Sequence, residues 1–175
     1  MPWAKIEHPI MLDFPPGKLC SSEYPNHKHG CPNYGKRPTC PPQASIINEQ
    51  FPGQWWAIWN KFEFFNHTER MRKAHPKWTD RQVANCLYWQ GRARKCLKIE
   101  LGRFRTIERL MTEPDAEFET VPEARGVNVT ETMKLVGIDL EWPPKYFTYQ
   151  VGLIFVIGDS ICALPTKNIQ PSCSR

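Results

Sequence analysis

Residues Thr79–Met111, TDRQVANCLYWQGRARKCLKIELGRFRTIERLM, carry the clearest periodic signal in the chain. Thr79 and Gln82 form a capping-box pattern at the start of this stretch. Apolar side chains then recur at helical spacing, at Val83, Leu87, Leu97, Leu101, Phe104, Ile107 and Met111. The pattern predicts one long amphipathic helix, with Gly91 and Gly102 as the positions where it would bend or split.

The opposite face of this helix is basic. It carries Arg109 and a set of side chains that we call the basic face, the predicted contacts for nucleic acid: Arg92, Arg94, Lys95, Lys98, Arg103 and Arg105. Such a face can contact phosphate groups or nucleic acid, although a run of charge is more often simply solvated. The acidic stretch from Glu113 to Glu123, expected to be a loop, would neutralise part of the charge. Nucleic acid is therefore a possible partner of the basic face.

Two strands are expected to flank the helix in sequence. Residues 55–65, WWAIWNKFEFF, alternate in polarity and place Trp56, Ile58, Phe62 and Phe64 on one side. Residues Tyr146–Ile157 hold the most apolar run of the chain and predict a buried strand.

The remaining segments complete the predicted fold. Residues 67–77 are expected to be an exposed connector, and residues 138–141 a short strand. Asn128 with Glu131 predicts a second helix start, with Gly137 as its stop. Together these elements predict an α+β domain with a largely antiparallel sheet, one long basic amphipathic helix and a cysteine- and proline-rich N-terminal arm.

Length and composition favour one domain. The chain has 175 residues, 41% of them hydrophobic and 23% charged, which suits a single globular core. We expect residues 1–52 to form the arm and residues 53–175 the α+β core of the same fold. No apolar run approaches the length of a membrane-spanning helix, and the N-terminus lacks a secretory pattern. These features predict a cytoplasmic protein with no membrane contact, whose cysteines are reduced.

The arm contains a segment rich in thiols and prolines, residues 20–42, which we call the cysteine loop. Eight residues separate Cys31 from Cys40, and ten residues separate Cys20 from Cys31. The prolines and Gly35 exclude a helix or a central strand here. A stiff loop of this kind can direct several thiols at one point and loses little entropy when a metal ion binds.

The motifs in and beyond this loop resemble the predicted metal-binding protein family of bacteria and archaea, whose function is not known. The resemblance is carried by Cys31-Pro-Asn-Tyr-Gly-Lys36 followed by Cys40-Pro-Pro42, by Pro122-Glu-Ala-Arg125, by Gly137-Ile-Asp139 and by Gly152-Leu-Ile154. A second cysteine cluster found in many members is missing from residues 110–120. The resemblance therefore implies one metal or iron–sulfur centre, not two.

The loop thiols and the resemblance together name Cys20, Cys31 and Cys40 as metal ligands. Thiolates bind both zinc and iron–sulfur clusters. Long and irregular spacing favours a cluster, [4Fe-4S] in type, over zinc, whose thiolate sites use tighter spacing. The fourth ligand stays open among Cys162, Cys173, His27 and His29, with Cys162 as the main candidate, or the site has no fourth protein ligand.

Other residues have weaker assignments. Tyr34 and Lys36 lie inside the cysteine loop, where they could orient the thiolates, meet a bound anion or simply shape the turn. Cys86 is expected in the core, on the opposite side of the long helix from Cys96.

The sequence thus predicts redox or metal-dependent chemistry on a small or nucleotide-like substrate. The alternative is a zinc-stabilised module that binds nucleic acid or a protein through the basic face.

Overall fold

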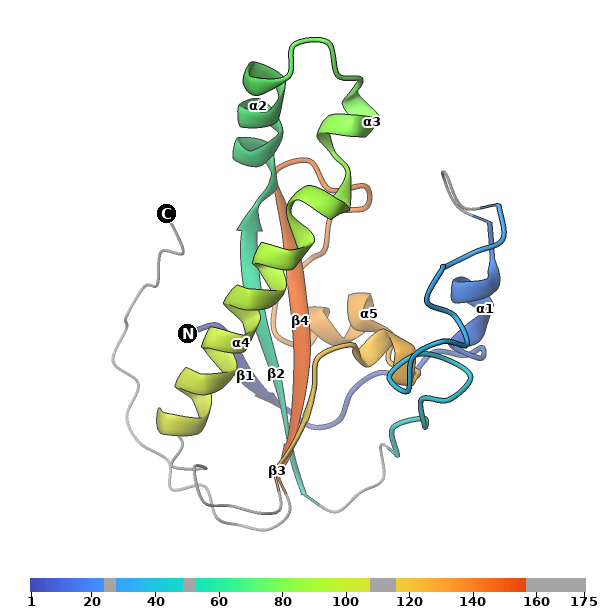
Figure 1. The fold of residues 1–175 in the computed structure, drawn as a ribbon. Helices are drawn as coiled ribbons and strands as arrows, with labels where there is room; N and C mark the ends of the chain where they lie inside the picture. Colours follow the sequence, from blue (N-terminus) through green and yellow to red (C-terminus); the bar gives the residue numbers. More distant parts are fainter. Residues whose placement is uncertain (24–27, 49–52, 108–115, 157–175) are drawn as a thin grey trace.

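The structure is a computed structural model, and it describes residues 1–23, 28–48, 53–107 and 116–156. Within these residues the strands form one antiparallel sheet in the order β1-β2-β4-β3 (Figure 1). The strands are β1 (Trp3–Ile6), β2 (Gln54–Glu63), β3 (Ala116–Glu119) and β4 (Phe147–Val156). The predicted α+β class is confirmed.

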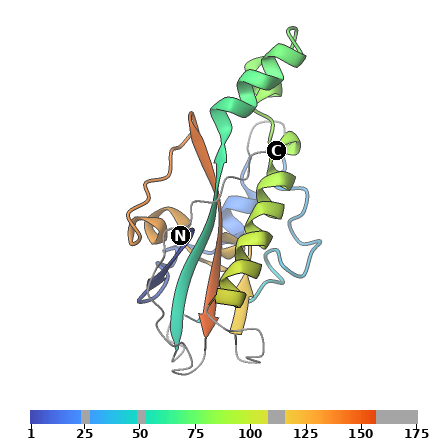
Figure 2. The same cartoon turned by 90° about the vertical axis from the view of Figure 1, so that its left-hand side faces the viewer.

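The helices lie on both faces of this sheet and beyond one end of it (Figures 1 and 2). They are α1 (Gly17–Ser21), α2 (Phe64–Ala74), α3 (Asp80–Val83), α4 (Gln90–Ile107) and α5 (Val129–Lys134), with short 3-10 helices η1 (Cys86–Tyr88) and η2 (Pro122–Arg125). No helix in the described part of the chain is long and apolar enough to cross a membrane.

The long central pair of strands organises the core. Strands β2 and β4 pair from Gln54 opposite Val156 to Glu63 opposite Phe147. Alternate residues along each strand point to opposite faces of the sheet, so each face buries its own set of side chains. The two long strands match the predicted ones closely, because both carry a sustained strand pattern.

One face of the sheet packs against α4. The cluster on this side contains Ile58, Ile154 and Val156 from the sheet, and Leu97, Leu101 and Phe104 from α4. Gly152 lies beneath the helix, where a Cβ atom would come within 2.9 Å of the Glu119 carbonyl oxygen and 3.6 Å of Leu97 Cδ2. A glycine at this position therefore allows the close approach of α4 and β3 to β4.

The other face packs against α5 and the N-terminal arm. Trp55, Ala57, Leu153 and Phe155 meet Ile6, Ile47, Val127, Val129 and Met133 there. Helix α5 begins as predicted, since the Asn128 side chain accepts a hydrogen bond from the Glu131 N–H. It ends as predicted too: Gly137 has φ 74°, and the N–H groups of Gly137 and Ile138 donate to the carbonyls of Lys134 and Met133. This pairing is a Schellman motif.

The predicted long helix is broken into three pieces. Its start is confirmed, because Thr79 and Gln82 form the capping box. The break, however, falls at Ala84–Asn85 and at Trp89, not at the glycines. The Asn85 side chain accepts the Leu87 N–H, and the Trp89 indole donates to the Ala84 carbonyl at 3.2 Å, so side chains hold the turn between α3 and α4.

This break changes which side chains are buried. Leu87 belongs to η1 and is 82% exposed, whereas the helical pattern placed it in the core. Cys86 is also exposed, so its predicted core position is wrong. Val83, Leu97, Leu101 and Phe104 are buried as predicted.

Four segments differ from the prediction. Residues 67–74 belong to α2, where His67 and Thr68 are buried, and residues 138–141 form no strand. The expected loop at Glu113–Glu123 contains β3 and the start of η2 in its described part, and the N-terminal arm contributes β1. Strands β1 and β3 are four residues each, too short to display a period. They form strands because they pair with β2 and β4.

Candidate metal centre

The backbone segments that carry the first two cysteines of the cysteine loop, Cys20 and Cys31, lie side by side. Helix α1 carries Cys20, whose carbonyl oxygen accepts the Cys31 N–H at 2.7 Å. Gly30 stands directly before Cys31 with φ 77°, and a Cβ atom there would overlap the Cys20 carbonyl oxygen. Glycine therefore permits both the left-handed backbone and the contact that brings these two residues together.

A series of turns leads from Cys31 to Cys40. The Tyr34 N–H donates to the Cys31 carbonyl at 3.0 Å, and the Cys40 N–H donates to the Arg37 carbonyl at 2.9 Å. The Gly35 N–H then donates to the Pro41 carbonyl at 2.9 Å, which returns the Cys40 end of the segment to its middle. The prolines predicted this irregular backbone correctly.

Tyr34 braces the loop against α1. A Cβ atom on Gly17, the first residue of α1, would lie 3.3 Å from both the ring and the hydroxyl oxygen of Tyr34. The same atom would lie 3.6 Å from Pro41, so the ring, the helix start and the Cys40 end of the loop meet at one place. Of the three roles considered for Tyr34 from the sequence, this contact supports the shaping of the turn.

The thiols of Cys31 and Cys40 act electrostatically on that of Cys20. Cys20, Cys31 and Cys40 are free and partly exposed. Burial raises the pKa of the Cys20 thiol above its ordinary value, and the charges of Cys31, Cys40 and Glu123 raise it further. The three sulfurs are therefore gathered in one part of the molecule. In the described ranges, however, no three His, Cys, Asp or Glu side chains are placed closely enough to hold an ion.

Arg125 fastens the far end of the loop region to the sheet. Its Nε donates to the Ser45 carbonyl at 2.9 Å, and one terminal nitrogen donates to the Ser45 hydroxyl at 3.2 Å. The other terminal nitrogen lies 3.3 Å from a Glu119 carboxylate oxygen on β3. The Ile47 N–H donates to the Arg125 carbonyl at 3.0 Å, which adds a backbone link.

Sequence patterns did not indicate this role of Arg125. Pro122–Arg125 entered only as part of the family resemblance, with no contact assigned to it. In the structure η2 carries Arg125 toward Ser45 and also places Glu123 near the Cys20 thiol. The sequence offered one signal for this role, a basic side chain at the end of a short motif. It could not indicate the partner, because Ser45 lies 80 positions away in the sequence.

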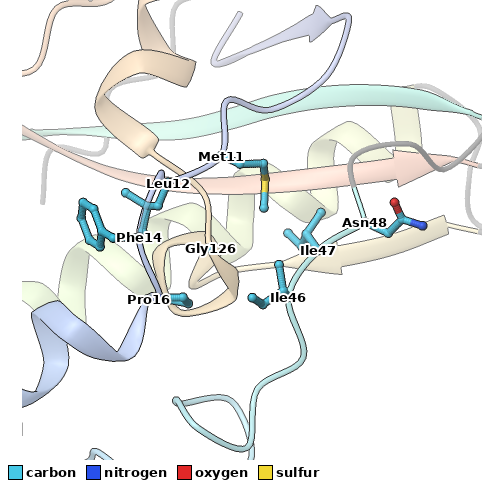
Figure 3. A pocket seen from close by; sticks show the side chains of 8 residues that line it. All are labelled: Met11, Leu12, Phe14, Pro16, Ile46, Ile47, Asn48 and Gly126. Atoms are coloured by element: carbon cyan, nitrogen blue, oxygen red, sulfur yellow. The ribbon is translucent and has the colours of Figure 1, made fainter.

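A cleft lined mainly by apolar side chains lies where the arm meets the segment after the loop (Figure 3). Its volume is about 260 Å³, and its lining is Met11, Leu12, Phe14, Pro16, Ile46, Ile47, Asn48 and Gly126. Gly126 has φ 91°, and a Cβ atom there would lie 3.2 Å from Met11 Cε. Because no thiol lines this cleft, it is a seam between the arm and the core, separate from the cysteines.

A second and larger pocket does include a thiol. We call it the loop pocket; its volume is about 400 Å³, and its lining is Lys28, His29, Gly30, Cys31, Pro32, Tyr34 and Lys36. Both residues predicted to meet a bound group, Tyr34 and Lys36, thus lie beside Cys31. His29, a candidate fourth ligand, is exposed in the same wall. Cys162, Cys173 and His27 lie outside the described residues.

The basic face is divided by its local contacts. Arg103 pairs with Glu100 at 3.0 Å, and the Arg105 guanidinium lies 5.0 Å from the centre of the Phe118 ring. Arg92 is half-buried. Arg94, Lys95 and Lys98 are exposed on α4 and are not among the α4 residues that pack on the sheet. These three residues are the part of the basic face best placed to meet a partner.

Comparison of the chain with protein-family models, with curated protein sequences and with solved structures gave no match. The family resemblance drawn from the motifs therefore stays a prediction.

Proposed function

We propose that this protein holds one metal or iron–sulfur centre through Cys20, Cys31 and Cys40 and uses it in redox or metal-dependent chemistry on a small or nucleotide-like substrate. The observation that carries the proposal is that three free thiols lie on one loop, with the backbones of Cys20 and Cys31 joined by a hydrogen bond at 2.7 Å. The electrostatic effect of Cys31 and Cys40 on Cys20 supports the same grouping.

The donor set fits a soft metal. Thiolate sulfur binds iron–sulfur clusters and zinc more readily than magnesium or calcium, which prefer oxygen. The wide cysteine spacing favours [4Fe-4S] over zinc. Closing such a site requires the thiols to move together and requires a fourth ligand, for which Cys162 is our first candidate and His29 an alternative. A cluster would supply an electron donor and acceptor, or an open iron, beside the loop pocket.

Metal analysis tests this proposal directly. The protein should be purified without oxygen, its iron, acid-labile sulfide and zinc measured, and its visible spectrum recorded. We expect iron and sulfide that disappear in Cys31→Ala and Cys40→Ala but are retained in Cys86→Ala, the matched control for an exposed thiol outside the loop. Absence of any bound metal from the wild-type protein would overturn the proposal, and zinc without colour would replace the cluster with a zinc site.

A zinc-stabilised binding module is the second candidate, and the exposed side chains of Arg94, Lys95 and Lys98 favour it. Cationic side chains on one helical face release counterions when they contact phosphates, so binding depends steeply on salt. If the face binds nucleic acid, changing all three residues to Gln should reduce the salt slope by roughly 3, because each side chain would neutralise one phosphate.

The control for that experiment removes equal charge elsewhere. Arg70, Lys73 and Lys77 lie on or just after α2, and changing them to Gln leaves the basic face intact. A salt slope that falls equally in both triple variants would mean diffuse attraction and not a defined nucleic-acid interface. A cytoplasmic location remains part of the proposal, but the accompanying prediction that the cysteines are reduced is wrong for Cys96, which is disulfide-bonded.

A further inference from the structure

The loop pocket and the proposed metal centre share a residue. Cys31 is a proposed ligand, and it also lines the pocket together with Gly30 and Pro32. Because the Cys31 N–H is held by the Cys20 carbonyl at 2.7 Å, this wall of the pocket is fixed relative to α1. A molecule in the pocket would therefore lie beside whatever the thiols hold.

The lining of the pocket is cationic. It contains Lys28, Lys36 and His29 and no carboxylate among its described residues. Both lysines are exposed, and no ion pair that involves either of them is found in the described part of the chain. Two unpaired ammonium groups on one concave surface attract an anion and can donate charge-assisted hydrogen bonds to it.

The size of the pocket limits the ligand. A volume of about 400 Å³ is within the range of small-molecule sites and too small to be a groove for a protein or a nucleic-acid strand. Tyr34 adds an aromatic wall with a hydroxyl group, and its ring is braced against Gly17. The remaining body of a small organic molecule can pack against this wall.

We propose that the loop pocket binds a small phosphorylated molecule, with its phosphate between Lys28 and Lys36 and the rest of the molecule beside Cys31. Two lysines match the charge of a phosphate group, about −1.5 to −2 at neutral pH, better than that of a single carboxylate. This inference rests on the proposed function, because it assigns a substrate class to the proposed metal centre. Anion binding itself is measurable whether or not a metal is present.

The test uses inorganic phosphate as the probe and acetate as the competing anion. Binding to the full-length, metal-loaded protein is measured by titration calorimetry at low ionic strength and pH 7.5. We expect saturable binding of one phosphate. In the Lys28→Gln/Lys36→Gln double variant the affinity should fall at least about tenfold, which corresponds to the loss of roughly one charge-assisted hydrogen bond. Acetate should bind at least about tenfold more weakly than phosphate.

Arg37→Gln is the matched control, because Arg37 is an exposed cation on the same loop that does not line the pocket. It should change the affinity less than about twofold. Equal losses in Arg37→Gln and in the double variant would overturn the proposal, as would the absence of saturable phosphate binding. Acetate binding as tightly as phosphate would overturn the assigned ligand class.

The two proposals can fail separately. Metal content is measured on the same samples, and phosphate binding is repeated after the metal is removed. Metal without phosphate binding would overturn the pocket assignment and leave the metal centre intact. Phosphate binding to a protein that takes up no metal would overturn the metal centre and leave the anion site. If both hold, phosphate should also shift the visible spectrum of the loaded protein, since Cys31 belongs to both sites.

Discussion

Two glycines in the cysteine loop share a backbone conformation but have different surroundings. Gly30 has φ 77° and Gly35 has φ 69°, both in the left-handed region. A Cβ atom on Gly30 would overlap the backbone of Cys20 and Ser21, whereas one on Gly35 would meet nothing within 4 Å. Substituting each glycine in turn therefore distinguishes the effect of backbone strain from the effect of the contact that joins Cys20 to Cys31.

Gly35→Ala should lower the free energy of unfolding by about 1–2 kcal/mol, the cost of a left-handed alanine, and leave metal content unchanged. Gly30→Ala carries the same cost and must also push Cys20 away from Cys31, so we expect a larger loss of stability and loss of the metal. Urea unfolding of the metal-free proteins and metal analysis of the loaded ones would measure both effects. Normal metal content in Gly30→Ala would show that the Cys20–Cys31 contact does not form the site.

His67 gives the protein a predicted pH dependence. It is buried on α2, its Nε2 has no hydrogen-bond partner among the described residues, and an Arg70 nitrogen lies 3.4 Å from its Nδ1. Burial lowers the pKa of His67 below its ordinary value, and the charges of Arg70 and Arg92 lower it further. The folded protein therefore keeps this imidazole neutral.

The unfolded chain takes up a proton on His67 near pH 6.5, before the folded chain does. The stabilisation is thus fully present above about pH 6.5 and is lost as the pH falls toward the lower, folded pKa. Urea midpoints measured from pH 5 to pH 8 should fall on the acid side, and His67→Gln should reduce that fall. His8→Gln, at an exposed position, is the control. An unchanged acid slope in His67→Gln would contradict the assignment.

At the scale of elements, an aromatic cluster around Phe104 is part of what holds α4 to the sheet. Phe104 is fully buried between Trp3 and Trp56, with ring centres 5.7 and 5.2 Å away. Trp3 belongs to β1 and Trp56 to β2, so a single side chain joins the helix to two strands. Edge-to-face aromatic contacts of this kind add to the stabilisation from burial.

Phe104→Ala should lower the free energy of unfolding by about 3–5 kcal/mol, because it removes this contact and leaves a cavity. Ile99→Ala, on the same helix but half exposed, should cost less than about 0.5 kcal/mol. Chemical denaturation measures both. Similar losses in the two variants would mean that helix propensity, and not the Phe104 cluster, dominates the stability of α4.

Elements with enough residues to display a period were predicted from the sequence. The long strands β2 and β4, the start of α3 at Thr79 and both ends of α5 follow from alternation or capping residues. Strands β1 and β3 could not be found this way, because pairing with a neighbour far away in the sequence makes them strands. The break before α4 depends on the Trp89–Ala84 hydrogen bond, a contact that periodicity does not reveal.

On the scale of the whole molecule, the cysteine loop is outside the sheet and has few ties to it. The Met11–Val127 bridge and the hydrogen bond from Leu12 to the Gly126 carbonyl hold the arm, and Arg125 holds the segment that follows Cys40. The sequence could predict that the thiols share a loop. It could not predict this fastening, since Ser45, Glu119 and Arg125 come together only when β3 and η2 have formed.

Arg125→Gln should therefore loosen the loop from the core. We expect the free energy of unfolding to fall by about 1–3 kcal/mol, the cost of removing a charged hydrogen-bond donor and leaving the Glu119 carboxylate without its cationic partner. Hydrogen exchange of residues 43–48 should increase, and metal content should decrease because the Cys40 end of the loop is no longer held. Arg72→Gln is the control: Arg72 pairs with Glu69 and Asp80, each at 2.9 Å, but both pairs are exposed to solvent, so this change should affect the free energy of unfolding less than Arg125→Gln does. If exchange in residues 43–48 stays slow in Arg125→Gln, the arm contacts alone position the cysteine loop, and the thiols depend on the N-terminal arm instead of on η2.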